Sequence, residues 1–221
     1  MSKDLFSSQS KLYARYRPVY PQELFDYILS FVDTKGEAWD CATGNGQAAR
    51  VLADYFEHVD ASDISEEQLR NAIRKMNIQY HHCPAEKTPF SNNKFDLITV
   101  ATAYHWLNWD EFHKEATRVG KEKAVVAVWA YNLLSSDDPA INDLIEKFYY
   151  EIIHPYWDPE RIHVENAYSN VKFNFDPLPS KDFSIRLGWT KEHLKGYLQT
   201  WSGVRNHVEK KGSDPLELIK F

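Results

Sequence analysis

Residues 37–49 place the strongest limit on how this chain can fold. The stretch ends an apolar run at Trp39, closes it with Asp40 and continues into the small residues of 43–46, Thr-Gly-Asn-Gly. The apolar run predicts a buried strand, and the spacing of apolar residues predicts a helix over 47–56. A strand, a tight glycine turn and a helix in this order bring a ligand close to backbone N–H groups at the positive end of a helix. We therefore expect a site for a nucleotide-bearing cofactor.

Apolar runs alternate with helical patterns up to residue 131. Strands are predicted at an apolar run ending in Trp39-Asp40 and at 58–65, 78–83, 95–101 and 123–131. Helices are predicted over 21–32, over 47–56, from Ser65 to about Met76, and after Trp109. Near-continuous apolar strands that alternate with helices indicate a mostly parallel sheet with helices on both faces. The expected fold class is α/β.

Residues 132–180 break this alternation. A helix predicted from Asp138 to about Ile153 is followed by a stretch rich in proline and aromatic residues, 154–159. We interpret 132–180 as an insertion that covers the C-terminal edge of the sheet.

The remaining residues predict a sixth strand and two helices. The strand is predicted over 181–187, one helix from its cap Thr190 to Trp201, and a short last helix over 214–221. We expect a single domain over residues 1–221 with four parts. These are an N-terminal lid with the first helix (1–35), a cofactor-binding core (36–131), a substrate-lid insertion (132–180) and a C-terminal strand with helices (181–221).

Composition argues against several classes of protein. The formal net charge of −6 disfavours a nucleic-acid partner, because neutralising phosphates requires a basic face. No run of about 18 apolar residues predicts a membrane span, and residues 1–10 lack the apolar segment of a secretory signal. With only Cys41 and Cys83, a reducing cytoplasm is the expected location. The 14% of aromatic residues suggests a large apolar pocket.

The glycine loop fits two classes of cofactor. Gly44 to Ala49 matches G-x-G-x-x-A, and Asp63 follows Gly44 by 19 residues, at a distance suited to binding ribose hydroxyls. Enzymes that use NAD and enzymes that use S-adenosylmethionine both fit this pattern. Asp40 favours the second, because it would repel a pyrophosphate and attract the ammonium of a methionine tail. The alternative for Asp40 is a structural role as a cap of the loop.

The ordered motifs resemble those of class I S-adenosylmethionine-dependent methyltransferases. Residues 40–46, Asp-Cys-Ala-Thr-Gly-Asn-Gly, resemble the family motif D-x-G-x-G-x-G. Further matches follow at 62–65, 84–90, 95–98 and 104–106, so that the resemblance covers about residues 5–131. The opening Tyr-Ala-Arg-Tyr-Arg-Pro-Val-Tyr-Pro, the pair His105-Trp106 and Thr200-Trp201-Ser202 resemble the small-molecule group that includes trans-aconitate methyltransferase-like proteins. The resemblance implies a Rossmann-like fold and a small-molecule acceptor.

The resemblance also implies roles for individual residues. Gly44 and Gly46 would lie near the methionine carboxylate, Asp63 would bind both ribose hydroxyls, Ile64 would pack on the adenine, and the backbone of Ala85 would meet the ring edge. The residues that we assign to the cofactor are Tyr13, Asp40, Ala42, Gly44, Gly46, Asp63, Ile64, Ala85, Glu86 and Ala101.

The chain departs from the family pattern at two of its positions. Ala42 replaces the first glycine, which an extended backbone tolerates. Pro84 replaces the acid that usually takes the adenine amine, so Glu86 is our substitute; the alternative for Glu86 is a solvated carboxylate.

Methyl transfer requires alignment of donor and acceptor and exclusion of water. Aromatic faces suit a sulfonium, which favours Tyr13, Tyr16 and Trp106. His105 is suited to take a proton from a neutral acceptor, whereas a carboxylate acceptor needs a cation such as Arg15 or Arg17. We assign His105 and Tyr16 to catalysis, and Arg17, Trp106 and Trp157 to the acceptor. The alternatives are a structural hydrogen bond for His105, apolar packing for the aromatic residues and solvated surface charges for the arginines.

Methylation at oxygen, on a carboxylate or a hydroxyl, is the leading hypothesis for the reaction. The rival functions are an NAD-dependent oxidoreductase and a methyltransferase-fold protein that binds cofactor without catalysis. A metal is not expected at His81-His82-Cys83, because alternate side chains of a strand diverge. The chain is expected to be a monomer or, if a sheet edge is exposed, a homodimer.

Overall fold

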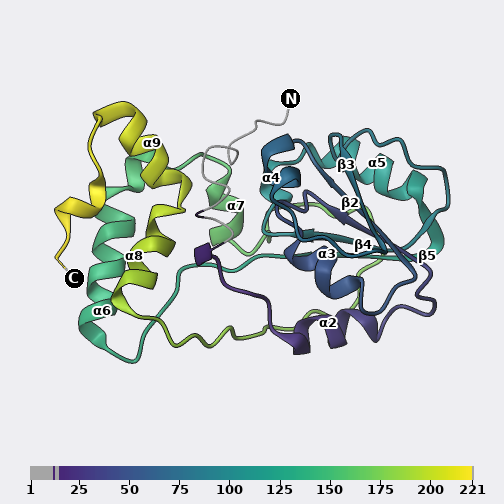
Figure 1. Ribbon diagram of the computed structural model, residues 1–221, viewed down its shortest axis with the longest axis horizontal. Coiled ribbons are helices and arrows are strands. Elements are labelled where there is room, and N and C mark those ends of the chain that lie inside the picture. Colours follow the sequence, from purple (N-terminus) through teal and green to yellow (C-terminus); the bar gives the residue numbers. More distant parts are fainter. Residues whose placement is uncertain (1–11, 13–14, 221) are drawn as a thin grey trace.

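Five parallel strands form one sheet in the order β3-β2-β1-β4-β5 (Figure 1). The computed structural model describes residue 12 and residues 15–220. The strands are β1 (Glu37–Cys41), β2 (His58–Asp63), β3 (Ile78–His82), β4 (Phe95–Ala101) and β5 (Gly120–Trp129). All five predicted strands of the core are confirmed. Because the strand order reverses between β1 and β4, a crevice is expected at their carboxyl ends.

Helices cover both faces of the sheet. The helices are α2 (Gln22–Leu29), α3 (Gln47–Leu52), α4 (Glu66–Arg70), α5 (Trp109–Val119), α6 (Pro139–Lys147), α7 (Arg161–Glu165), α8 (Lys191–Gln199) and α9 (Ser202–Lys211). Successive strand residues point to opposite faces, so Leu97 packs with α2 and α3 whereas Ile98 packs with α5 and α7. Both are fully buried. The sheet is therefore the middle of three layers. No helix among the described residues is long and apolar enough to cross a membrane.

A separate helical unit lies beside the sheet, at the left of Figure 1. It is built from α6, α8 and α9, and its apolar cluster includes Phe148, Tyr197 and Trp201. A π-helical turn, Phe148–Ile152, continues α6. Asp138 caps α6 and Thr190 caps α8, as predicted, with backbone N–H groups donating to their side chains.

The predicted sixth strand is wrong. Residues 181–187 pair with no strand. Phe183 instead packs against the ring of Tyr27 on α2 at 5.7 Å between centroids, and the Tyr27 hydroxyl donates to the carbonyl of Pro179 at 3.0 Å. The apolar side of this segment thus packs on the surface of a helix. A helix has no free row of backbone N–H and C=O groups with which a strand could pair.

Helix ends also differ from the sequence expectation. Ser65 caps α4 by accepting the N–H of Gln68 at 3.2 Å, as predicted, but α4 ends at Arg70 and not near Met76. The end of a short helix is set by tertiary contacts more than by apolar spacing.

A buried carboxylate fastens the edge of the sheet that lies opposite the crevice. Asp96 in β4 accepts hydrogen bonds from the hydroxyl of Thr34, the ammonium of Lys121 and the N–H groups of Gly36 and Glu37, at 2.5, 2.7, 3.2 and 2.9 Å. Burial alone would raise the pKa of Asp96, but these hydrogen bonds hold it below the ordinary value of 3.8. These four hydrogen bonds connect β4 to β5, to the start of β1 and to the loop that precedes β1.

We expect Asp96→Ala to lower the free energy of unfolding by about 2–4 kcal/mol at pH 7, because four hydrogen bonds to one buried, charged acceptor are lost. The folded-state pKa lies below the unfolded one, so this contribution is present above pH 3.8 and is lost as pH falls through the folded-state value. Urea unfolding of both proteins at pH 7 and pH 3 measures it. The control is Asp137→Ala at an exposed acid, which should change stability by less than about 0.5 kcal/mol. Equal effects of the two substitutions would contradict the assignment.

Candidate active site

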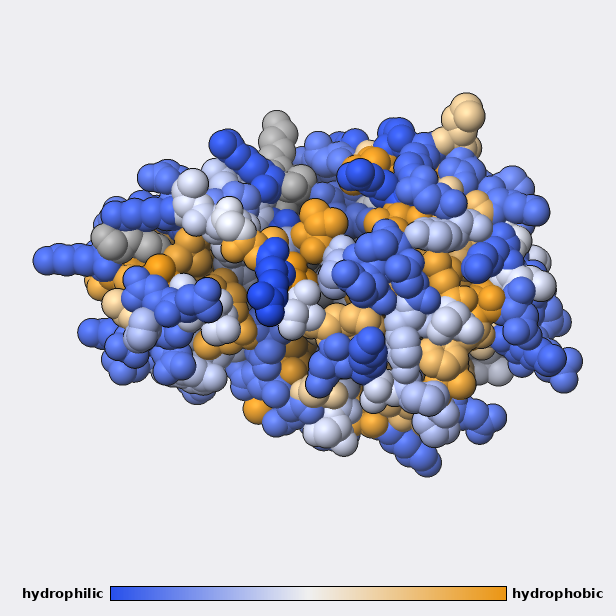
Figure 2. Space-filling model, turned by 90° about the horizontal axis from the view of Figure 1, so that it is seen from below, coloured by the Kyte–Doolittle hydropathy of each residue, from blue (hydrophilic) through white to orange (hydrophobic). Residues whose placement is uncertain are grey.

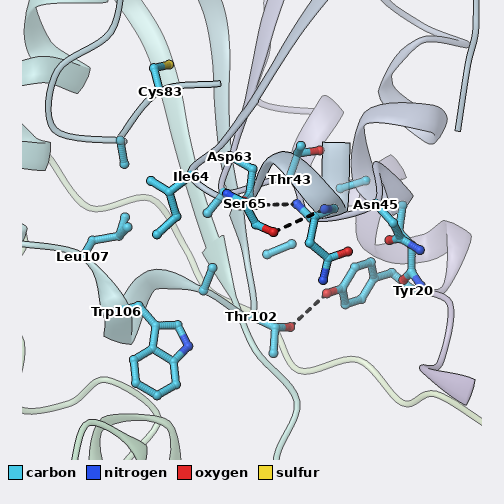
Figure 3. A pocket seen from close by; sticks show the side chains of 18 of the residues that line it. Tyr20, Thr43, Asn45, Asp63, Ile64, Ser65, Cys83, Thr102, Trp106 and Leu107 are labelled. Carbon is cyan, nitrogen blue, oxygen red and sulfur yellow. Dashed lines mark hydrogen bonds between the residues drawn. The ribbon is translucent and has the colours of Figure 1, made fainter. Parts of the chain in front are cut away.

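A cavity of about 1000 Å³, counted with its open mouth, lies at the carboxyl ends of the strands (Figure 3). The first residue after each of β1, β2, β3 and β4 lines it, and so does the second residue after β5. These residues are Ala42, Ile64, Cys83, Thr102 and Tyr131. The topology thus brings together segments that lie far apart in the sequence.

Asp40 lies beneath the glycine loop and does not line the cavity. Its carboxylate accepts from the hydroxyls of Thr43 and Thr99 at 2.5 and 2.7 Å and from the N–H of Ala49 at 3.0 Å. Burial raises the pKa of Asp40 to about 6, although these hydrogen bonds oppose the rise. The Asp40 carboxylate therefore binds donors within the protein, and a contact with a methionine ammonium, directly or through water, stays a prediction. These contacts match the alternative interpretation of Asp40, a structural role as a cap of the glycine loop.

Ala42 adopts a left-handed backbone with φ 53°, so the expectation of an extended backbone is wrong. This conformation costs a residue with a Cβ about 1–2 kcal/mol. Gly44 and Gly46 share it, with φ 56° and 83°. At Gly46 a Cβ would overlap the hydroxyl of Tyr80, whereas at Gly44 it would meet nothing within 4 Å. Gly44 is therefore open to the cavity, while Gly46 does not line it.

The carboxylate of Asp63 forms part of the cavity wall. One oxygen accepts from the N–H of Gly44 and the other from the N–H of Ser65, both at 2.8 Å. Figure 3 shows these two bonds side by side at the end of β2. Asp63 thereby ties the glycine loop to the start of α4 and presents a negative charge to the cavity.

The structure brings together only part of the predicted site. The predicted residues that line the cavity are Ala42, Gly44, Asp63, Ile64, Ala85, Ala101 and Trp106. The predicted residues that do not line it are Asp40, Gly46, Glu86, His105, Tyr16, Arg17 and Trp157. Tyr13 lies outside the described residues.

Glu86 does not line the cavity. Its carboxylate accepts from the N–H of Asn108, the cap of α5, at 2.9 Å. The carboxylate thereby lies at the positive end of a helix, where it is stabilised. The assignment of Glu86 to an adenine amine is not supported by this position.

His105 faces a second hollow on the other side of the loop that carries Trp106. It is 7% exposed, and its Nδ1 lies 3.0 Å from the hydroxyl of Tyr168. Burial, with smaller effects of Arg161 and His163, lowers its pKa to about 3. His105 is therefore neutral near pH 7 and has little affinity for a proton. Its contacts match the structural reading and not that of a general base.

Tyr16, Arg17 and Trp157 belong to the helical unit. Tyr16 packs on Gly196, where a Cβ would clash with its ring, and Trp157 packs on Gly203 and Trp201. Arg17 donates to the hydroxyl of Tyr131 at 2.8 Å and to the carbonyl of Thr200 at 3.0 Å. It contacts the cavity wall at Tyr131, and its guanidinium also reaches the helical unit at Thr200.

Several cavity residues were not found by sequence reasoning. They are Tyr20, Thr43, Asn45, Gln47, Ala48, Ser65, Gln68, Cys83, Thr102, Ala103, Leu107 and Tyr131. Thr102 and Tyr131 follow strand ends, so the rule that carboxyl ends of parallel strands meet at one edge was a usable signal. Tyr20 had no such signal, since its hydroxyl is within 2.9 Å of the Thr102 hydroxyl across 82 residues of sequence.

No group of three or more His, Cys, Asp or Glu side chains suited to a metal ion occurs within the described part of the chain. In the cluster His81-His82-Cys83, His81 contacts Asp60 at 2.5 Å and His82 contacts the carbonyl of Ile64 at 2.9 Å. The two imidazoles thus have different partners.

A glycine loop, an acid after the second strand and a cavity at the switch point define the class of Rossmann-like enzymes that bind a nucleoside cofactor. Residues 39–128 match the family described as a methyltransferase domain. A candidate methyltransferase of Dictyostelium discoideum is 35% identical over 220 residues, which cover 98% of this chain and 84% of that protein. The methyltransferase AacuQ of Aspergillus aculeatus is 25% identical over 79% of this chain and 60% of its own length.

A solved structure gives the same result. That of a candidate type II methyltransferase from Anaeromyxobacter dehalogenans has a TM-score of 0.82 and 36% sequence identity, covering 92% of this chain and 86% of that one. The chain therefore belongs to the class I S-adenosylmethionine-dependent methyltransferases.

We expect Ala42→Gly to leave the free energy of unfolding unchanged or to raise it by up to about 1 kcal/mol. Relief of the left-handed backbone offsets the greater freedom of glycine in the unfolded chain. Ala48→Gly, inside α3, is the matched control and should lower it by about 1 kcal/mol or more. Urea unfolding checks both, and equal losses would show that Ala42 carries no backbone strain.

Proposed function

We propose that the cavity binds S-adenosylmethionine and that the protein transfers its methyl group to a small-molecule acceptor, leaving S-adenosylhomocysteine. The observation that carries the proposal is the Asp63 carboxylate beside the N–H of Gly44 on the wall of a cavity of about 1000 Å³. A carboxylate in this place suits two vicinal hydroxyls, and it would repel a phosphate.

The residues present fit the cofactor. Gly44 has open space where a Cβ would stand, so a ligand is able to approach the backbone closely. Asp63 would hold the ribose, and the apolar wall of Ile64, Ala85 and Leu107 would hold the adenine. Asp40 and Gly46 would act from below, by keeping the loop in its left-handed turns.

The bound cofactor supplies an electrophilic methyl group on a sulfonium. The protein's part is to align an acceptor with that group and to exclude water. Trp106, Tyr20 and Tyr131 present aromatic side chains to the cavity, and such faces favour a cation by roughly 0.5–2 kcal/mol.

A carboxylate is the acceptor that the surroundings favour, with a hydroxyl as the alternative. His105 is neutral and faces another hollow, so no proton acceptor with a pKa near 7 is supplied by it. A carboxylate needs no base. It needs a cation, and Arg161 in the insertion is a candidate besides Arg17.

Arg161 is held by neutral groups. Its guanidinium donates to the Tyr149 hydroxyl at 2.9 Å and to the Asn132 side-chain oxygen at 3.0 Å, and lies 5.3 Å from the Trp157 ring centroid. No ion pair joins it to a carboxylate in the described part of the chain. Asn132 follows Tyr131 of the cavity wall in sequence, and this connection supports Arg161 as the cation for the acceptor.

Two segments are proposed as lids within one methyltransferase domain. Residues 15–20 join the parts, because Arg17 bonds to the helical unit and Tyr20 to the end of β4. Residues 132–180 supply Arg161 and Trp157. We propose a monomer or homodimer, no nucleic-acid partner and a cytoplasmic location, on the net charge of −6 and the two free cysteines.

Calorimetry with S-adenosylhomocysteine tests the cofactor. The wild type should bind it, and Asp63→Asn should weaken binding by about 10- to 100-fold, because hydrogen bonds to a charged group are lost. Asp33→Asn, at an exposed acid, is the control and should bind as the wild type does. Absence of binding by the wild type, or equal binding by Asp63→Asn, would overturn the proposal.

A panel of small mono-, di- and tricarboxylic acids with S-adenosylmethionine tests the acceptor. The wild type should form S-adenosylhomocysteine with at least one acid. Arg161→Gln should raise KM for that acid by about tenfold or more, because a charged hydrogen bond is lost. The affinity for S-adenosylhomocysteine should stay unchanged. Arg50→Gln, at an exposed arginine on α3, is the control. Turnover with alcohols alone would favour the hydroxyl alternative.

A further inference from the structure

Gln68 carries a buried polar atom that the fold does not satisfy. The residue is 3% exposed and lines the cavity. Its side-chain oxygen Oε1 is buried and has no hydrogen-bond partner among the described residues. Buried side-chain oxygens in proteins are nearly always paired, so an exception requires an explanation. Since Gln68 lines a cavity, a ligand that donates a hydrogen bond would satisfy this atom.

The position of Gln68 is set from Asp63 by a short relay. The N–H of Ser65 donates to Asp63 Oδ1 at 2.8 Å, and Ser65 Oγ in turn accepts the N–H of Gln68 at 3.2 Å. All three residues line the cavity. The acid and the amide therefore come from one corner of the cavity wall, between β2 and α4.

We propose that Gln68 is a cofactor-binding residue whose Oε1 accepts a hydrogen bond from a ribose hydroxyl. The inference rests on the proposed function, in which Asp63 binds the ribose. Each oxygen of Asp63 already accepts one backbone N–H, from Gly44 and from Ser65. A ribose brings two hydroxyl donors to this corner, and Gln68 supplies a second acceptor for them.

The proposal predicts opposite effects on stability and on binding. Gln68→Met replaces the amide with an apolar side chain of similar size, so the protein without ligand loses an unsatisfied acceptor and keeps its packing. Its unfolding midpoint should equal or exceed that of the wild type. Its affinity for S-adenosylhomocysteine should fall about 3- to 10-fold, the worth of one hydrogen bond. A residue with a structural role alone would not separate the two effects in this way.

The experiment combines variants of the protein with variants of the ligand. Calorimetry would compare S-adenosylhomocysteine with its 2′-deoxy and 3′-deoxy forms on the wild type and on Gln68→Met. The wild type should lose affinity for both deoxy forms. For one of the two deoxy forms, Gln68→Met should lose about 3- to 10-fold less affinity than the wild type does. The reason is that the variant already lacks the hydrogen-bond partner of the hydroxyl that this form is missing. Gln79→Met, at an exposed glutamine on β3, should behave as the wild type in every measurement.

Each outcome decides the question. Unchanged affinity of Gln68→Met for S-adenosylhomocysteine would overturn the role of Gln68 and leave the proposed function intact. Equal losses with both deoxy forms in the two proteins would overturn the ribose assignment. Wild-type protein that binds no S-adenosylhomocysteine would overturn the proposed function itself. If Gln68→Met does not fold, Gln68→Leu replaces it, and tight binding of both deoxy forms by the wild type would still refute the proposal.

Discussion

The carboxylate of Asp40 is buried beneath the glycine loop, and three elements converge on it. Thr43 belongs to the loop, Ala49 to α3 and Thr99 to β4, and each donates a hydrogen bond to this one group. A carboxylate without these donors would be costly to bury, and the pKa of about 6 reflects the balance between burial and hydrogen bonding. The arrangement holds the loop in its left-handed turns. The cavity wall formed by Ala42 and Gly44 depends on it.

Two acids thus act on opposite sides of one loop. Asp40 holds the loop from below, and Asp63 holds the N–H of Gly44 from the cavity side. Among the described non-glycine residues, Ala42 and Thr102 have a left-handed backbone and also line the cavity. Each directly follows the end of a strand. Strained backbone of this kind is typical of binding sites, because the surrounding structure must enforce it. Arg17 and Tyr20 then connect the cavity rim to the helical unit. On the face seen in Figure 2, this unit shows hydrophilic side chains with apolar ones between them.

Local patterns predicted the five core strands and their parallel arrangement, because continuous apolar runs such as 95–101 bury both faces of a strand. They also predicted the acid at the end of β2 and the caps Ser65 and Thr190, since a cap bonds to its own helix. The same reasoning failed at residues 181–187. Apolar alternation indicates that one side of a segment is covered, but it does not say whether a strand or the helix α2 covers it.

The sequence by itself therefore determined the layered fold, the family and the edge of the sheet at which the site lies, because these depend on neighbouring residues and ordered motifs. Only the tertiary structure decided which side chains reach the cavity. Asp40 and His105 carry suitable chemistry, yet one is turned beneath the loop and the other into a second hollow. Gln68 bears no motif, yet it lines the cavity and its amide oxygen is buried without a hydrogen-bond partner among the described residues. Such differences arise from backbone torsions and from packing between distant segments, which spacing along the chain does not encode.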